Sequence, residues 1–312
     1  MHLYNLLCEE FSASRQEVSQ FAFSAPKKYK LYRIPKRSSG TRLIAHPSRQ
    51  LKKYQRYLAD HLALKLPVHR AAMAYQKGIG IRENANAHKR GRYLLKMDFY
   101  NFFPSITPTL FFKFLDLQSL PYTKEDKYLL KNLLFCNLSK KSGGSLRLSI
   151  GAPSSPFISN AIMYYFDEAL FSKCKKLKIS YTRYADDLTF SSNVSGVLFG
   201  IPDLVAQCLT DCFGGAILIN ESKTVFSSKA HNRHVTGITI TNDGSLSVGR
   251  ERKRQVSAMI HNYSVGRLGP EDCGYLRGLI SFVLSVEPNF RQRMEKKYSK
   301  GVMDSLMEGG NE

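Results

Sequence analysis

Two neighbouring carboxylates stand out in the sequence because they fall in a tight turn between two β-rich runs. The turn is Tyr184-Ala185-Asp186-Asp187, between expected strands over residues 178–184 and 188–192. Adjacent residues of a regular strand point to opposite faces of a sheet, so two neighbouring carboxylates can serve one cation site only in a turn. Taken alone, an Asp-Asp pair at a hairpin tip is ordinary solvated turn chemistry.

A third carboxylate changes this interpretation. Asp98 ends an apolar run over residues 93–97 that is expected to be a buried strand. A carboxylate at the end of one strand and two in the turn of a neighbouring hairpin can converge on two Mg²⁺ ions about 3.5 to 4 Å apart, and hard oxygen ligands suit Mg²⁺. Asp98, Asp186 and Asp187 therefore predict nucleotidyl transfer, with a hydroxyl as the attacking group and pyrophosphate as the leaving group.

The elements that must hold these carboxylates follow from periodicity, capping residues and turns. The N-terminal segment is expected to be helical, with a capping box at Ser14 and Glu17. Residues 30–45 are expected to form a β-hairpin with a basic tip. Further helices are expected over residues 48–66, 107–115, 123–135, 157–175 and 202–213, and further strands over 216–219, 234–240 and 245–248. From residue 250 onward the pattern is helical and basic.

The charge of the chain points to a polyanionic partner. The sequence has 46 Lys and Arg against 25 Asp and Glu, a formal net charge of +21. An excess this large costs self-repulsion unless a ligand neutralises it, and phosphates are the ligands that release counterions on binding. The basic residues are spread along the chain. This distribution favours a long nucleic-acid groove over a membrane surface.

The same composition excludes several classes of protein. The apolar runs fall short of the roughly 18 residues that cross a bilayer, so no membrane partner is expected. The N-terminus lacks the features of a secretory signal, which predicts a cytoplasmic protein. None of the six cysteines forms a Cys-x-x-Cys pair, so buried thiols are expected in place of metal ligands or disulfides.

Six short motifs follow one another along the chain. They are Asn84-Ala85-Asn86-Ala87-His88; Asp98 with Phe102-Phe103-Pro104-Ser105-Ile106; Gly151-Ala152-Pro153-Ser154-Ser155-Pro156 with Asn160; Tyr184-Ala185-Asp186-Asp187; Asn220 with Lys223 and Thr224; and Val235-Thr236-Gly237. In this order, and over nearly the whole length, the sequence resembles reverse transcriptases. The first and last motifs match elements of the bacterial retron type. Ser149-Ile150 stands where relatives usually carry Pro-Gln, which puts template or nucleotide positioning in question.

The resemblance implies an α+β fold, the right-hand polymerase. Fingers with N-terminal helices and a basic hairpin are expected over residues 1–92. A palm with an antiparallel sheet is expected over 93–249, including finger-side helices at about 107–150, and a helical RNA-binding thumb over 250–312. The implied reaction is RNA-directed DNA synthesis from dNTPs with two Mg²⁺ ions, for which Mn²⁺ is the expected substitute.

The retron resemblance also implies the partners. These are a dedicated structured noncoding RNA, copied in part into msDNA from the 2′-OH of an internal guanosine, an effector protein encoded nearby, and a place in bacterial defence against phage. Because the remaining length leaves no room for an RNase H domain, trimming of the RNA is expected from a host RNase H.

Site residues are carried over motif by motif. The implied metal ligands are Asp98, the backbone carbonyl of Phe99, Asp186 and Asp187. The implied nucleotide-binding residues are Lys36, Arg42, Phe103, Gly151 and Lys223. The expected nucleic-acid-binding residues are Asn84, His88, Arg250, Arg252, Lys253, Arg254, Arg277 and Arg291.

Several of these assignments have a plainer alternative. Phe103 is either an aromatic gate against a ribose 2′-OH or a core aromatic, and for Phe102 beside it the core is favoured. Lys36 and Arg42 either clamp a triphosphate or lie on a solvated hairpin. Lys223 is either a charge stabiliser near the pyrophosphate or an exposed lysine. Asn84 and His88 either recognise RNA or satisfy each other.

Two rival functions remain open at this point. One is another reverse transcriptase lineage, group II intron-like or diversity-generating, against which the Asn-Ala-x-x-His and Val-Thr-Gly elements argue. The other is a scaffold that holds RNA or msDNA and restrains an effector protein, with synthesis secondary. Replacing Asp186 and Asp187 with Asn separates catalysis from scaffolding.

Overall fold

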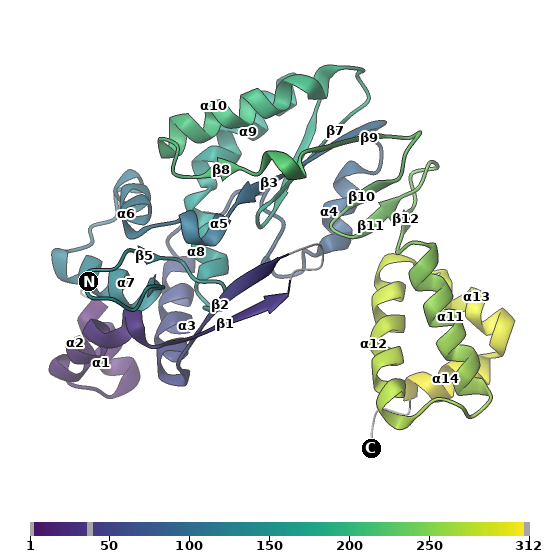
Figure 1. The fold of residues 1–312 in the computed structure, drawn as a ribbon, viewed down its shortest axis with the longest axis horizontal. Coiled ribbons are helices and arrows are strands. Elements are labelled where there is room, and N and C mark those ends of the chain that lie inside the picture. The colour runs from purple at the N-terminus through teal and green to yellow at the C-terminus, as the bar shows by residue number, and fades with distance from the viewer. Residues whose placement is uncertain (1–2, 36–39, 309–312) are drawn as a thin grey trace.

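The computed structural model describes residues 3–35 and 40–308. Figure 1 shows a large body built around a twisted sheet and, beside it, a bundle of C-terminal helices. The body begins with α1 (Leu3–Phe11), α2 (Arg15–Ser24), the 3₁₀ turn η1 (Ala25–Lys27) and the antiparallel hairpin of β1 (Tyr29–Pro35) and β2 (Thr41–Pro47). The predicted capping box is confirmed, because Ser14 and Glu17 each accept a hydrogen bond from the other's backbone N–H. The hairpin tip that carries Lys36 lies outside the described residues.

Helices pack against the central sheet and against the base of the hairpin, whereas most of β1 is exposed. In chain order they are α3 (Arg49–Ala63), α4 (Ile81–His88), α5 (Phe102–Ser105), α6 (Pro108–Leu117), α7 (Lys124–Leu134), α8 (Ser155–Ile162), α9 (Tyr164–Lys176), η2 (Val197–Gly200) and α10 (Ile201–Phe213), with a small hairpin of β4 (Cys136–Asn137) and β5 (Leu146–Arg147) after α7. The single helix predicted over residues 157–175 was wrong. Met163, with φ −76° and ψ 0°, interrupts it and separates α8 from α9.

The central sheet is antiparallel, with β3 (Tyr93–Tyr100) in its middle. On one side β3 pairs with β7 (Asp187–Ser192), which pairs with β6 (Ser180–Tyr184). On the other side it pairs with β8 (Leu218–Ile219) and with β9 (Val225–Ser228), and the 3₁₀ turn η3 (Glu221–Lys223) lies between these two. Leu95, Met97 and Phe99 of β3 are buried in the main hydrophobic core, as the apolar run predicts.

A second hydrophobic core lies at the C-terminal end. It is formed by α11 (Arg250–Ser264), α12 (Pro270–Val286), α13 (Phe290–Tyr298) and α14 (Lys300–Glu308) with the small sheet of β10 (Arg233–Val235), β11 (Ile238–Ile240) and β12 (Leu246–Ser247). The single strand predicted over residues 234–240 was wrong, because Thr236 and Gly237 have φ of 47° and 82° and reverse the chain. Val235, Ile238 and Ile240 therefore pack with the C-terminal helices.

Two further expectations concern covalent and membrane chemistry. All six cysteines are free thiols, and four of them are buried. Among the described residues, no helix is long and apolar enough to cross a membrane.

Candidate active site

The turn between β6 and β7 is held in place by the strand beside it. Tyr184 pairs with Asp187 across the hairpin, and Ala185 takes the left-handed conformation, with φ 57°, that closes the turn. The backbone N–H of Phe99 donates to the carbonyl oxygen of Asp186 at 3.1 Å. The end of β3 and the turn are thereby fixed to each other.

A buried arginine supports the turn from below. Arg183 of β6 donates from Nη1 to the carbonyl oxygen of Ala185 at 3.1 Å and to Oδ1 of Asn160 at 3.0 Å. Asn160 in turn donates to the carbonyl oxygen of Ala74 at 2.8 Å. The motif residue Asn160 thus has a structural role. It binds Arg183, which holds the turn of Asp186 and Asp187, and it also anchors the segment that precedes Tyr75.

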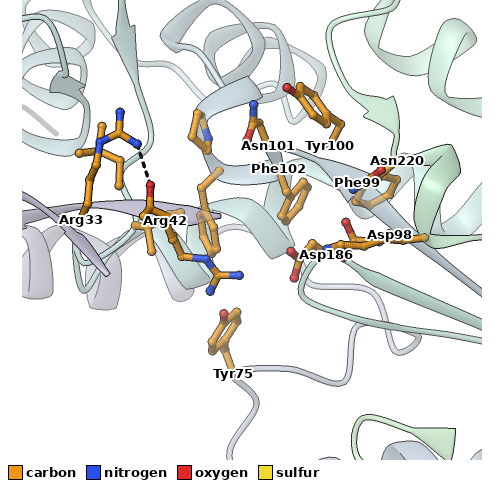
Figure 2. Close-up of a pocket in the computed structure, with 16 residues that line it drawn as sticks. Arg33, Arg42, Tyr75, Asp98, Phe99, Tyr100, Asn101, Phe102, Asp186 and Asn220 are labelled. Carbon is orange, nitrogen blue, oxygen red and sulfur yellow. Dashed lines mark hydrogen bonds and ion pairs between the residues drawn. The ribbon is translucent and has the colours of Figure 1, made fainter. Parts of the chain in front are cut away.

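Asp98 and Asp186 line one cavity of about 360 Å³. Figure 2 shows the two carboxylates on one wall, with Arg42 of β2 and Tyr75 across the cavity from them. Asp187 lies directly opposite Asp98 in the pairing of β3 with β7, but it does not line this cavity. The structure therefore brings two of the three predicted carboxylates to the cavity and keeps the third beside them.

The pKa values of Asp186 and Asp187 are both raised. Burial and then the charge of Asp98 raise the pKa of Asp186. Burial, followed by the charges of Asp186 and Asp98, raises the pKa of Asp187 to about 6. Negative charges crowded in this way stabilise a bound cation.

The ammonium group of Lys223 already compensates part of this charge. Its Nζ lies 2.8 Å from Oδ2 of Asp98, and its side chain is half-exposed. Within residues 3–35 and 40–308, no three His, Cys, Asp or Glu side chains are gathered closely enough to form a complete metal site. The donor set nevertheless fits a divalent cation. The ammonium group of Lys223 already pairs with Asp98, and burial together with the charge of neighbouring carboxylates raises the pKa values of Asp186 and Asp187.

Of the predicted nucleotide-binding residues, those within the described part of the chain divide between this cavity and an adjoining one. Arg42, Phe103 and Lys223 line it, and Arg33, which sequence reasoning missed, lies near Arg42 and donates to Oγ1 of Thr41 at 3.0 Å. Gly151 lies in an adjoining cavity that also reaches Phe103. Gly151 has φ 119°, and a Cβ there would lie 3.0 Å from the carbonyl oxygen of Ala45, so only glycine fits.

The aromatic residues after Asp98 divide as expected between core and cavity. Phe102 is 3% exposed and stacks on Phe99 with ring centroids 5.2 Å apart, which confirms its core position. Phe103 is half-buried and lines the cavity. Phe99 is buried as well, and it contributes to the cavity lining.

Tyr75 was missed by sequence reasoning. It is 56% exposed, has φ 62°, and lines the cavity opposite Asp186. Burial and then the charge of Asp186 raise the pKa of its hydroxyl. A left-handed, exposed tyrosine is a strained arrangement that is common at functional sites, but no local motif in the sequence announces it.

The structure corrects the expectation that Asn84 and His88 contact nucleic acid. Both are fully buried, with 0% exposure, so neither side chain can touch RNA directly. They hydrogen-bond to residues of β6, β7 and the β10–β11 turn and not to each other. The alternative that Asn84 and His88 satisfy each other was right about their structural role but wrong about their hydrogen-bond partners, which lie far away in the sequence.

The six C-terminal cations predicted to bind nucleic acid fall into two groups, those with partners inside the protein and those that are exposed. Three have internal partners: Lys253 pairs with Glu287, Arg291 with Glu295 and Asp304, and Arg277 donates to the carbonyl oxygen of Leu306. Arg252 lies over the ring of Phe282. Arg250 and Arg254 are exposed and form no ion pair with any described residue.

A broad basic groove of about 1080 Å³ lies near the hairpin of β1 and β2. Its charged lining within the described residues consists of cations: Lys27, Lys28, Lys30, Arg49, Lys52, Lys53, Arg56 and Lys140. Lys52 and Arg56 also line the adjoining cavity that contains Tyr75, Phe103 and Gly151. The groove and the candidate active site are thus connected.

Comparison with known families gives a match to reverse transcriptase (RNA-dependent DNA polymerase) over residues 34–240. The chain is similar to the retron Ec83 reverse transcriptase of Escherichia coli, with 48% identity over 90% of this chain and 91% of the relative. It is also similar to the retron Ec73 reverse transcriptase of Escherichia coli, with 31% identity over 97% of this chain and 96% of the relative.

Among solved structures, telomerase from Candida albicans in complex with a fragment of telomeric RNA matches with a TM-score of 0.52 at 14% identity. The match covers 93% of this chain and 58% of that one. At this identity the likeness concerns the fold alone, and it agrees with the expected right-hand polymerase.

Proposed function

The chain belongs to the reverse transcriptase family and, within it, to the retron reverse transcriptases, and on this basis we propose which reaction, primer and partners it has. It is an RNA-directed DNA polymerase of a retron. We infer that it copies part of a dedicated noncoding RNA into msDNA and begins from the 2′-OH of an internal guanosine of that RNA. The observation that carries the chemistry is the placement of Asp98 and Asp186 on one wall of a cavity that Arg42 and Lys223 also line.

Reverse transcriptases depend on divalent metal, and here Asp98, Asp186, Asp187 and the backbone carbonyl of Phe99 would hold it. When bound, two Mg²⁺ ions, or Mn²⁺ in their place, supply neutralisation of the triphosphate and a lower pKa for the attacking hydroxyl. The carboxylates are held in fixed positions relative to each other, because the turn that carries Asp186 is hydrogen-bonded to β3 at Phe99.

The cations of the cavity are suited to the phosphates. Arg42 offers a planar fork that can contact two phosphate oxygens, and it lies close enough to Asp186 for its charge to offset a small part of the rise in that group's pKa. Lys223, half-exposed beside Asp98, stabilises the charge that develops on the leaving pyrophosphate or protonates it. Lys36 lies on the same hairpin as Arg42, and we propose that it contacts the triphosphate as well.

The sugar of the nucleotide meets aromatic side chains. Phe103 lines both the active-site cavity and the adjoining cavity at Gly151. We propose that its ring lies under the sugar and leaves room for hydrogen but not for a 2′-hydroxyl. Tyr75, across the cavity, bounds the same space.

The protein has two basic surfaces that can bind nucleic acid. The connected groove that contains Lys53 and Arg56 is suited to the RNA template ahead of the active site, because it lies along a continuous path from Phe103. On the thumb, Arg250, Arg252 and Arg254 remain available for phosphates of the RNA–DNA duplex. We propose that Lys253, Arg277 and Arg291 contribute there through the helices they hold together.

The biological setting is part of the proposal. We infer that the enzyme works in the bacterial cytoplasm, that its complex with msDNA restrains an effector protein encoded nearby, and that this system defends against phage. Host RNase H is the expected source of template removal. The proposed fingers, palm and thumb are residues 1–92, 93–249 and 250–312. The small sheet of β10–β12 lies within the palm range but shares the second hydrophobic core with the thumb helices, so we call that core the thumb core, that sheet the thumb sheet and its β10–β11 hairpin the thumb hairpin.

The test is to express the gene with its flanking noncoding DNA and purify the protein. The co-purifying nucleic acid is then run on a denaturing gel before and after RNase and debranching treatment. A discrete DNA is expected that survives RNase, shifts on debranching and is absent from Asp186→Asn/Asp187→Asn. If only RNA co-purifies and the double variant gives the same pattern, the priming proposal fails and an RNA-binding scaffold becomes the better account.

A further inference from the structure

A chain of buried hydrogen bonds runs from the catalytic hairpin to the first hairpin of the thumb. It begins at Ser191 of β7, whose Oγ lies 2.8 Å from Nδ1 of His88. Nε2 of His88 lies 2.7 Å from Oγ1 of Thr182 on β6. All three side chains are at most 3% exposed. Helix α4 is therefore tied through His88 to both strands of the hairpin that carries Asp186.

The chain continues from the palm into the thumb through Asn84. Thr182 donates to Oδ1 of Asn84 at 2.6 Å, and Nδ2 of Asn84 donates to Oγ1 of Thr236 at 3.4 Å. Thr236 then donates to the carbonyl oxygen of Ile81, at the start of α4, also at 3.4 Å. Thr236 lies in the two-residue turn between β10 and β11, so one turn of the thumb sheet rests on α4.

The donors and acceptors of this chain fit only one direction. Because the hydroxyl hydrogen of Thr182 is used on Asn84, Thr182 can only accept from His88, whose Nε2 must carry the proton. Nδ1 of His88 then accepts from Ser191. Burial lowers the pKa of His88 to about 3, which keeps the ring neutral with a single N–H, as this order of bonds requires.

The second hydrophobic core extends to α4 and β3 beside this chain of hydrogen bonds. Ala85, next to Asn84 on α4, belongs to the thumb core together with Val235 and Ile238. Leu94 of β3, four residues before Asp98, belongs to it too. The links from α4 to the β6–β7 hairpin are short, at 2.6 to 2.8 Å, whereas the two links at Thr236 are 3.4 Å long. The joint is therefore firm on the palm side and weakest at the thumb hairpin.

We propose that Asn84, His88 and Thr236 are positioning residues that form a latch between the catalytic hairpin and the thumb, engaged at Thr236. The latch fixes where the thumb hairpin stands relative to Asp186, and with it the path of the RNA–DNA duplex that the thumb holds. This inference rests on the proposed polymerase function and on the thumb as its duplex-binding part. The reacting groups are not part of the latch, so its loss affects duplex retention and leaves the chemical step unchanged.

The test uses the full-length protein with Thr236→Val, which removes the hydroxyl and keeps a β-branched side chain in the left-handed turn. Thr236→Ser restores the hydroxyl. Thr239→Val is the matched control, since Thr239 lies in the same small sheet and its hydroxyl contacts only His234 among the described residues. The probe is a DNA primer annealed to an RNA template.

We expect Thr236→Val to bind this duplex about fivefold more weakly, because the hydroxyl of Thr236 makes two long hydrogen bonds and we take them together as worth one ordinary hydrogen bond. It should also add fewer nucleotides per binding event in the presence of a heparin trap. The single-turnover rate of the first addition at saturating dNTP should stay at the wild-type value. Thr236→Ser and Thr239→Val should match the wild type in all three measurements. Equal duplex affinity in Thr236→Val and Thr239→Val, or a first-addition rate that falls as far as the affinity, overturns the latch.

Hydrogen–deuterium exchange tests the latch without catalysis. In Thr236→Val, the backbone amides of β10 and β11 should exchange faster than in the wild type, while those of β3 should not change. Unchanged exchange in β10 and β11 overturns the latch even in an enzyme that polymerises. Faster exchange there supports it even if no primer is extended, an outcome that would count against the polymerase function alone.

Discussion

Arg183 and Asp167 form a fully buried ion pair beside the turn that carries Asp186 and Asp187. Nη2 of Arg183 lies 2.6 Å from Oδ2 of Asp167, and both side chains are 0% exposed. The hydroxyl of Tyr181 also donates to Asp167, at 2.7 Å. Since Arg183 holds the carbonyl oxygen of Ala185, this pair places the backbone that presents Asp186.

Removing one partner of this pair should be costly. In Asp167→Asn the charge of Arg183 is left buried without a counter-ion, which costs about 3 to 5 kcal/mol of unfolding free energy. Asp116→Asn is the control, because Asp116 forms an exposed ion pair with Lys127, worth about 0 to 1 kcal/mol. Urea unfolding followed by circular dichroism measures both. Equal stability of the two variants would contradict the structural role given to Asp167.

Lys223 is expected to matter for the rate of the chemical step. Lys223→Met removes a charge and a proton source beside Asp98, and the single-turnover rate of nucleotide addition should fall by about 100-fold. Lys223→Arg should retain part of the rate, since it keeps the charge. Lys229→Met, which changes a lysine outside the cavity lining, is the control. A rate in Lys223→Met equal to that of the control would exclude Lys223 from the reaction.

The raised pKa of Asp187 makes a prediction about stability and pH. The folded protein holds this proton up to a pH of about 6, whereas the usual pKa of the group is 3.8. The folded state therefore binds more protons than the unfolded state in this window, and without divalent metal this group makes stability fall as pH rises from about 4 to about 6.

Asp187→Asn should then stabilise the metal-free protein at pH 8 by about 1 kcal/mol, a value reduced for the exposure of the side chain. The gain should be smaller at pH 5 and should be offset when Mg²⁺ is added to both proteins. Thermal unfolding in EDTA measures it, with the exposed Asp60→Asn as control. A gain independent of pH would show that repulsion among the carboxylates is not its cause.

Phe103 is expected to select the sugar. Phe103→Ala should raise the efficiency of ribonucleotide addition relative to deoxyribonucleotide addition by about tenfold or more, because the space under the sugar opens. The ratio of kcat/KM for the two nucleotides measures this. Phe199→Ala, at a 71% exposed phenylalanine outside the cavity lining, should leave the ratio as it is. Unchanged discrimination in Phe103→Ala would restore the plainer interpretation as a packing residue.

The basic groove should set the salt dependence of template binding. In the double variant Lys30→Ala/Lys53→Ala, the slope of log K against log salt for single-stranded RNA should become shallower by about 1.4, or about 0.7 for each lost phosphate contact. Lys175→Ala/Lys176→Ala removes two exposed lysines from the C-terminal end of α9, outside the groove. Equal slopes in the two double variants would mean that the groove does not hold the template.

The convergence of Asp98 and Asp186 could be predicted because it depends on local signals. An apolar strand that ends on a carboxylate and a tight turn between two strands are each visible in a short window, and antiparallel pairing brings them together. Phe102 and Phe103 were likewise separable, since only one of two neighbours can face the core.

The remaining features depend on contacts between distant segments. Nothing near Met163 marks the end of a helix, and nothing near Tyr75 marks a left-handed residue at the edge of the site. Asn84 and His88 carry the polar character of an RNA-binding motif, yet their partners lie about 100 to 150 residues away, so their burial emerges only once the palm and the thumb hairpin meet. Secondary-structure propensity and motif spacing do not predict contacts between such distant segments.

The separate core of the C-terminal helices has a consequence for how such enzymes diversify. Those helices bury their apolar faces largely against one another and against the small sheet of β10–β12, with few residues such as Ala85 and Leu94 from the rest of the chain, so most substitutions there need not be matched by substitutions around Asp98. The helices that we propose meet the RNA can therefore change in sequence while the residues around Asp98 stay constant. A lineage of such enzymes can in this way come to bind different nucleic acids with the same carboxylates.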